Sequence, residues 1–171
     1  MGWFSKRTTT VASSPKHFKA TSEALLHSIT GLRTGLSIRV HQLYSPQYGD
    51  EARFLCAGIL NYVTASTPTN EAGKRYMSEK PALVKTEAAK LHLAPEIRKA
   101  LSYLYTAEIL YLTMAGLSGN KLAQAQIPRL TERASELNIV IPDAQEISGK
   151  GDAYSCAQAI AAYAIEFTAG R

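Results

Sequence analysis

The 171-residue sequence contains few cysteines and no metal-binding pattern. Its two cysteines, Cys56 and Cys156, lie far apart in apolar, alanine-rich surroundings, which is typical of small buried residues in a reducing compartment. The four histidines do not occur at a metal-ligand spacing, and no Cys-x-x-Cys is present. We therefore expect no structural disulfide, no metal and no other cofactor.

Long hydrophobic runs and a secretion signal are also lacking. The longest apolar stretch, residues 101–117, contains Glu108, Ser102 and two threonines, so we expect a buried helix and not a membrane span. The amino terminus has no apolar segment of the kind that directs secretion. We expect a protein that is neither secreted nor transmembrane and that is cytoplasmic or associated with a virion.

Enzyme motifs are missing too. There is no phosphate-binding GxxxxGK[ST], no GxGxxG after a strand, no GxSxG and no HExxH, so we assign no catalytic residue. Glu108 is the unusual carboxylate, because its helix is so apolar. It either joins a polar stripe with Thr106 and Thr113, pairs with a buried Arg or Lys, or has a raised pKa. An enzyme with a site assembled from distant residues, Glu108 among them, is an alternative to the non-enzymatic interpretation.

What the sequence does contain is helical periodicity. From His17 onward, apolar residues recur every three, four or seven positions, which predicts a long amphipathic helix that Ser45-Pro46 should end. With the apolar segment 138–142 as a connector, this predicts an all-α fold, an irregular bundle of five to seven helices. The further helices are expected over residues 50–66 with Asp50 as N-cap, 71–77, 81–91, 96–115, 120–137 with a kink or break at Pro128, and 153–168 after the N-cap Asp152.

The first residues differ from the rest of the chain. Residues 1–16 are rich in Ser and Thr, contain no acid and show no helical or strand period, which predicts a flexible basic arm ahead of a single helical domain over 17–171. Trp3 and Phe4 in this arm can dock on this subunit or a neighbour, or contact a membrane surface beside Lys6 and Arg7.

The net charge of +5 is also concentrated at this end. Residues 1–48 carry six basic groups and one acidic group, whereas the remaining residues are balanced. On a helical wheel, Lys16 and Lys19 lie opposite the apolar stripe and Arg33 and Arg39 flank it. The residues expected to contact a partner or an anion are Trp3, Phe4, Lys6, Arg7, Lys16, Lys19, Arg33 and Arg39.

Two glycines interrupt the same long helix. Gly31 and Gly35 are spaced as GxxxG, and each destabilises a helix by roughly 1 kcal/mol, so we expect a packing reason for them. They permit the close approach of another helix, from this chain or from another subunit.

Residues 87–101 resemble a helix-turn-helix in outline. An alanine-containing helix, a short turn and a helix with Arg98 and Lys99 would suit a nucleic-acid-binding regulator. His92 occupies the position in the turn that Gly usually holds, and the second helix continues into the most apolar part of the chain. This is therefore a second alternative.

The sequence as a whole favours a non-enzymatic structural or assembly protein. We expect it to self-associate as a homo-oligomer or to pack on a protein partner, as a component of a virion, nucleocapsid or secretion machine does. Its basic arm and first helix would contact nucleic acid, an anionic membrane surface or a neighbouring subunit. No small-molecule substrate is evident.

Overall fold

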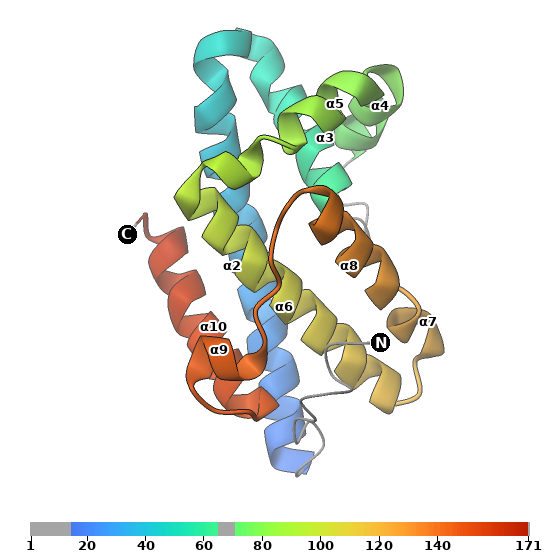
Figure 1. Cartoon of the computed structure of the whole chain (residues 1–171), viewed down its shortest axis with the longest axis vertical. Coiled ribbons are helices and arrows are strands. Elements are labelled where there is room, and N and C mark those ends of the chain that lie inside the picture. The colour runs from blue at the N-terminus through green and yellow to red at the C-terminus, as the bar shows by residue number, and fades with distance from the viewer. Residues whose placement is uncertain (1–14, 65–70, 171) are drawn as a thin grey trace.

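A computed structural model describes residues 15–64 and 71–170 (Figure 1). All regular elements in these ranges are helices, which confirms the all-α prediction, and seven of the helices have eight residues or more. In chain order the elements are α2 (Pro15–Tyr48), the 3-10 turn η1 (Gly49–Glu51), α3 (Ala52–Val63), α4 (Glu71–Glu79), α5 (Pro81–Ala88), the 3-10 turn η2 (Leu91–Leu93), α6 (Pro95–Leu117), α7 (Lys121–Gln124), α8 (Ile127–Glu136), α9 (Ala144–Ser148) and α10 (Ala153–Thr168).

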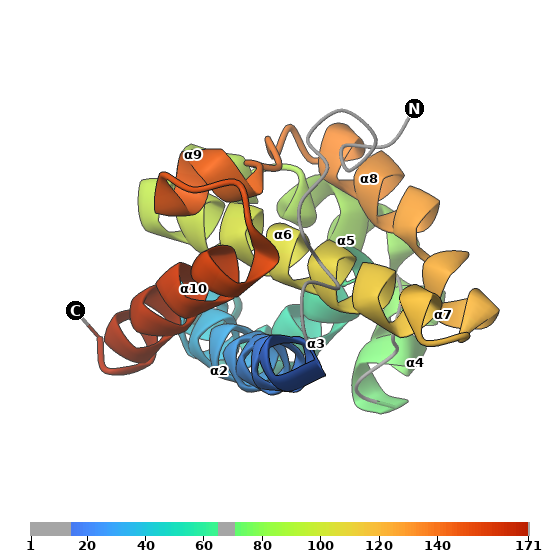
Figure 2. The same ribbon diagram turned by 90° about the horizontal axis from the view of Figure 1, so that it is seen from below.

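Helices α2 and α6 form the centre of the bundle. Figure 1 shows α2 along the long axis of the molecule, and Figure 2 shows α6 with α2 and α10 on one side and α8 and α9 on the other. Helix α6 is the predicted central helix, and Pro95 begins it as predicted. No helix in residues 15–64 and 71–170 is long and apolar enough to cross a membrane.

The core lies between these two helices and continues under α3 and α10. Apolar side chains at helical spacing along α2 and α6 face each other and exclude water, which provides most of the folding free energy. Fully buried members include Leu25, Leu32, Leu36 and Val40 of α2 and Leu101, Leu104, Tyr105 and Ile109 of α6.

The end of α2 differs from the prediction. Ser45-Pro46 does not end the helix, because Pro46 lies in its last turn and its missing N–H removes only one hydrogen bond. The helix ends at Tyr48, where Gly49 adopts a left-handed φ of 57° that residues with a side chain rarely adopt. The start also differs, since α2 begins at Pro15, two residues ahead of His17.

The predicted N-cap Asp50 was wrong as well. The 3-10 turn η1 connects α2 directly to α3, so no extended residue precedes α3 and no side chain caps it. Glu51 instead accepts hydrogen bonds from the Tyr76 hydroxyl at 2.7 Å and from Lys80 Nζ at 2.8 Å. Glu51 thereby connects the start of α3 to α4.

The second half of the chain follows the predicted pattern more closely. The chain breaks between α7 and α8 just before Pro128, and α10 begins after the N-cap Asp152 at the predicted residue. Helix α9 was not predicted. Its start is fixed by a capping box, in which the Asp143 side chain accepts from Glu146 N at 2.9 Å and the Glu146 side chain accepts from Asp143 N at 3.3 Å.

Candidate functional site

Only part of the predicted contact set lies in the described chain. Trp3, Phe4, Lys6 and Arg7 lie outside the described residues. Lys16 belongs to the first turn of α2, and the exposed Lys19 side chain lies 3.9 Å from Glu23, one turn along the same helix. An exposed pair at this distance contributes little to stability, so Lys19 remains accessible to an anionic partner.

Arg33 forms a buried ion pair with Glu108 of α6. Its Nη2 and Nε donate to Glu108 Oε1 at 2.7 Å and 3.1 Å, and Glu108 is only 4% exposed. Burial raises the pKa of Glu108 above its ordinary value, although the Arg33 charge lowers it. Glu108 Oε2 has no hydrogen-bond partner among the described residues. Two of the three expectations for Glu108 therefore hold together, since the carboxyl is paired and its pKa is raised.

Arg39 is also engaged within the fold. Its Nε lies 3.4 Å from Glu96 Oε1, and its guanidinium carbon lies 3.8 Å from the centroid of the Phe167 ring of α10. This stacked position is favourable because the ring face is electron-rich. The charges of Arg33 and Arg39 are thus matched by carboxylates within the domain.

The two glycines of α2 face α10 of the same chain. A Cβ at Gly35 would lie 2.6 Å from the Phe167 ring, and one at Gly31 would lie 3.4 Å from Thr168 Oγ1. The Thr168 hydroxyl also contacts the Gly31 carbonyl oxygen at 3.4 Å. The packing reason expected for these glycines is therefore the close approach of α2 and α10.

The segment that resembles a helix-turn-helix is built into the core. Its second helix, α6, buries Ile97, Ala100 and Leu101 in its first two turns and contacts α2. Arg98 and Lys99 are exposed, and Arg98 Nη1 donates to the His92 carbonyl oxygen at 3.2 Å. A recognition helix must enter a DNA groove along one free face, and only the short amino-terminal part of α6 presents one.

Two hollows border α2, and the first lies against α10. We call it the α2–α10 recess. It has a volume of about 430 Å³, and none of the described residues that line it carries a carboxylate, an ammonium or a guanidinium group. Ile165 at this recess is 67% exposed. The lining residues are His27, Ser28, Gly31, Ala161, Ala164, Ile165, Thr168 and Ala169.

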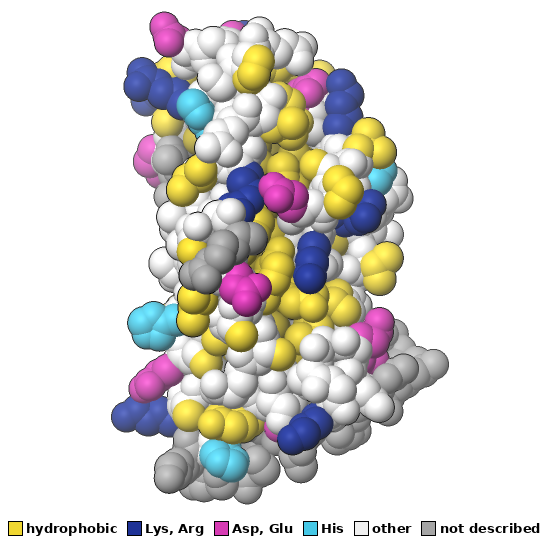
Figure 3. All heavy atoms as spheres, turned by 90° about the vertical axis from the view of Figure 1, so that its left-hand side faces the viewer, with side chains coloured by type: hydrophobic (Ala, Val, Ile, Leu, Met, Phe, Trp, Pro, Cys, Tyr) yellow, Lys and Arg dark blue, Asp and Glu magenta, His cyan; other side chains and the backbone are white. Residues whose placement is uncertain are grey.

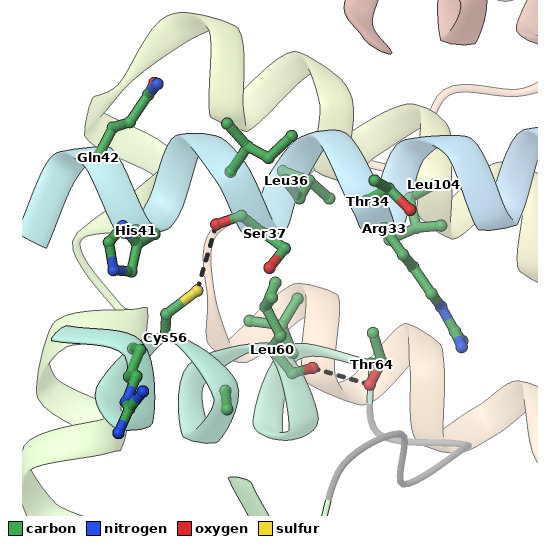
Figure 4. A pocket seen from close by; sticks show the side chains of 14 residues that line it. Arg33, Thr34, Leu36, Ser37, His41, Gln42, Cys56, Leu60, Thr64 and Leu104 are labelled. Carbon is green, nitrogen blue, oxygen red and sulfur yellow. Dashed lines mark hydrogen bonds between the residues drawn. The ribbon is translucent and has the colours of Figure 1, made fainter. Parts of the chain in front are cut away.

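The second hollow, which we call the α2–α3 groove, lies on the other side of α2 (Figure 4). Its volume is about 630 Å³. The described lining residues combine two arginines and a histidine with an apolar floor, and none of them is an aspartate or a glutamate. They are Arg33, Thr34, Leu36, Ser37, Ile38, His41, Gln42, Arg53, Cys56, Ala57, Leu60, Val63, Thr64 and Leu104.

The polar groups of the groove separate into two ends. Figure 4 shows His41 and Gln42 at one end of the α2 segment and Arg33 and Thr34 at the other. Arg53 precedes Cys56 by one turn of α3 and therefore belongs to the His41 end. Its guanidinium carbon lies 4.7 Å from the centroid of the adjacent Phe54 ring. Within the described ranges Arg53 has no carboxylate partner, in contrast to Arg33.

The middle of the groove contains a thiol and a hydroxyl. Cys56 Sγ donates to the Ser37 carbonyl oxygen at 3.4 Å, and burial raises the pKa of the Cys56 thiol (Figure 4). A raised thiol pKa disfavours the thiolate, which is the nucleophilic form of cysteine. Both cysteines are free and buried, as predicted. A hydrogen bond between the Ser37 side chain and Cys56 acts against the rise in the thiol pKa.

Sequence reasoning did not identify the α2–α3 groove. The expected contact residues do not include Arg53, which has no carboxylate partner among the described residues. Arg53, Cys56, Ala57 and Leu60 share one helical face by their spacing. That signal becomes useful only when α3 is known to lie against α2.

No group of three or more His, Cys, Asp or Glu side chains in residues 15–64 and 71–170 is arranged to hold a metal ion. Comparison with known protein families, curated proteins and solved structures finds no match for this chain.

Proposed function

We propose that this protein is a structural or assembly protein that self-associates by packing a second copy against the α2–α10 recess. The observation that carries the proposal is the composition of this surface. The recess of about 430 Å³ is lined mainly by small and apolar side chains, and the described lining contains no carboxylate, ammonium or guanidinium group. Charged groups are depleted in the same way at the centre of protein interfaces.

The surface beside the α2–α10 recess is also rich in hydrophobic side chains. On the side of the molecule where α10 lies, hydrophobic side chains form a band along the long axis, with charges of both signs at its edges (Figure 3). A partner helix can approach closely where the lining residues are glycine and alanine.

A second copy is the occupant that we favour, because one surface carries both the recess and the protruding Ile165 that can fill it. When such a surface meets its own copy about a two-fold axis, each Ile165 faces the recess of the partner. A different protein partner is the alternative outcome of the test.

The basic arm fits this proposal as a second contact. Arg33 and Arg39 are paired inside the domain. The charge excess of the first 48 residues therefore resides mainly at Lys6, Arg7, Lys16 and Lys19. We propose that these residues contact nucleic acid, an anionic surface or the next subunit.

Light scattering on the full chain and on Ile165→Lys tests the assembly. We expect the full chain to be a dimer or a larger oligomer and Ile165→Lys to be a monomer, because an ammonium group would be buried without a partner. Leu122→Lys is the matched control, since Leu122 is 80% exposed on α7 and does not border the recess.

The same measurement on residues 15–171 separates the arm from the recess. An oligomer that persists without residues 1–14 supports the recess as the interface. A monomeric full chain at every concentration, or an oligomer that Ile165→Lys leaves intact, would contradict the proposal.

A further inference from the structure

The α2–α3 groove has the dimensions and chemistry of a small-molecule site, independently of the assembly proposed above. Its volume of about 630 Å³ lies within the range of about 300–1,000 Å³ that ligand-binding clefts occupy. Its floor is formed by buried or half-buried apolar residues of three helices, Leu36 of α2, Ala57 and Leu60 of α3, and Leu104 of α6. An apolar ligand chain bound on this floor would be transferred from water to a largely apolar surface.

The charge of the groove is of one sign. The described lining contains Arg33, Arg53 and His41 and no carboxylate. The charge of Arg33 is compensated by Glu108, whose Oε1 lies 2.7 Å from Arg33 Nη2. Arg53 has no such partner in the described chain. The unmatched positive charge of the groove is therefore that of Arg53, one helical turn before Cys56 on α3.

Hydrogen-bond donors are distributed in the same way. The hydroxyls of Thr34 and Thr64 donate to carbonyl oxygens of their own helices, at 2.9 Å and 2.8 Å, so they present mainly methyl groups. Nearer the other end, the Gln42 amide is exposed and forms no hydrogen bond to the described residues. One end of the groove thus carries the unmatched Arg53 and an exposed amide, whereas at the other end the Arg33 charge is compensated by Glu108 and the threonine hydroxyls are already bonded.

We propose that the α2–α3 groove binds a small amphipathic anion, whose carboxylate or phosphate head lies between Arg53 and His41 and whose apolar chain runs toward Leu60 and Leu104. Arg53 provides a planar fork of donors that suits such a head group. A nucleic-acid strand requires cations spaced along a track of phosphates, and this groove has one unmatched arginine at one end.

Octyl phosphate, used below the concentration at which it forms micelles, is the probe, and calorimetry measures its binding to the full chain. We expect octyl phosphate to bind at least about tenfold more tightly than octyl glucoside, inorganic phosphate or octyltrimethylammonium, because only octyl phosphate has both the apolar chain and the negative head. Equal binding of the anionic and neutral probes, or no binding of any probe, would overturn the proposal.

Two substitutions locate the binding. Arg53→Gln is expected to weaken octyl phosphate binding by about tenfold or more while leaving octyl glucoside unchanged. Arg129→Gln, at an exposed arginine of α8 outside the groove, is the matched control and should have no effect. Both positions are exposed, so the thermal unfolding of both variants should match that of the parent.

Ser37→Leu tests the apolar part of the site. Position 37 is exposed on α2, so a leucine there fills the groove without disturbing the core. We expect it to abolish the binding of octyl phosphate. Binding that survives both Ser37→Leu and Arg53→Gln would place the ligand elsewhere and contradict the proposal. Salt-dependent binding of a single-stranded oligonucleotide that Arg53→Gln abolishes would identify a different occupant and would also contradict it.

Discussion

The two sides of α2 use different chemistry to meet their neighbours. Toward α10, α2 presents Gly31 and Gly35, and the hollow that remains is small and carries no carboxylate, ammonium or guanidinium in its described lining. Toward α3, it presents Arg33, Ser37 and His41, and the hollow is larger and cationic. One helix therefore supports a close contact on one side and an open polar groove on the other.

The difference follows from side-chain size and solvation. Glycine has no side chain to separate two backbones, so α2 and α10 approach until Phe167 contacts the Gly35 backbone. Arginine and histidine keep their polar heads toward water or a partner and cover apolar surface with their stems. A groove with a polar rim and an apolar floor is the result on the α3 side.

We expect the largest loss of stability from a substitution of Arg33, whose guanidinium is paired with the buried Glu108. Arg33→Met leaves the buried carboxylate of Glu108 without its partner, and breaking a buried pair in this way costs about 3–5 kcal/mol of unfolding free energy. Urea unfolding at neutral pH measures the loss. In the double variant with Glu108→Leu, we expect most of the loss to be recovered. A double variant as unstable as Arg33→Met would show that the shape of Arg33 matters more than its charge.

The loss in Arg33→Met should shrink as the pH falls. Burial already raises the pKa of Glu108, and removing the Arg33 charge, which lowers it, raises it further. The ordinary pKa of a glutamate carboxyl is about 4.3. At pH values between this pKa and the raised pKa of the folded variant, Glu108 is protonated in the folded state and ionised in the unfolded chain. Stability therefore increases as the pH falls through the folded pKa. Urea unfolding from about pH 8 to about pH 5 measures this, and a profile parallel to that of the parent would contradict it.

On the side of α2 that faces α10, replacing the two glycines by alanine should change the stability in opposite directions. A Cβ at Gly35 would lie 2.6 Å from the ring of Phe167. This ring is buried and held by Arg39, so it has little room to move. We expect Gly35→Ala to cost about 1–3 kcal/mol. Gly31→Ala makes an ordinary contact at 3.4 Å and should gain up to about 1 kcal/mol of helix propensity. Thermal unfolding of the two variants measures both changes in stability. Equal changes would show that contact with α10 does not cause the expected difference between the two positions.

A smaller effect is expected at the far end of α3. The Tyr105 hydroxyl of α6 donates to the Val63 carbonyl oxygen at 2.6 Å in the core. Tyr105→Phe leaves that carbonyl without its donor and should cost about 1–2 kcal/mol. Tyr111→Phe is the control, since the half-buried Tyr111 has no hydrogen bond to the described residues. Indistinguishable denaturant midpoints for the two variants would mean that Tyr105 does not anchor α3.

Local signals predicted the elements whose ends depend on nearby residues. Asp152 caps α10 and Pro95 begins α6, because an N-cap acceptor and a proline at the first turn act within three or four residues. The capping box of Asp143 and Glu146 was equally visible, and attention to it would have found α9.

The end of α2 shows where two local signals compete. The predicted end at Ser45-Pro46 did not consider Gly49, yet a proline in a last turn costs only one hydrogen bond, whereas the left-handed backbone of Gly49 ends the helix. A prediction that ended the helix at Gly49 instead of at Pro46 would have placed the end of α2 correctly.

The candidate sites depend on contacts that no local pattern specifies. The wheel placed Arg33 at the edge of the apolar stripe, but its partner Glu108 lies on another helix, and three outcomes for Glu108 stayed open from sequence alone. Arg53 became notable only when α3 was found beside α2 and no carboxylate was found beside Arg53. The identity of a neighbouring helix is a long-range property, and periodicity does not carry it.

The contact between α2 and α10 also determines when the bundle can close during synthesis. These helices lie at opposite ends of the described chain, and α10 is synthesised after the other described helices. The stripe with Gly31 and Gly35, and the core residues beneath it, stay open to water until α10 has been synthesised. Contacts of such long sequence separation form slowly, so a nascent chain that pauses before residue 153 presents an uncovered helix to chaperones or to other chains.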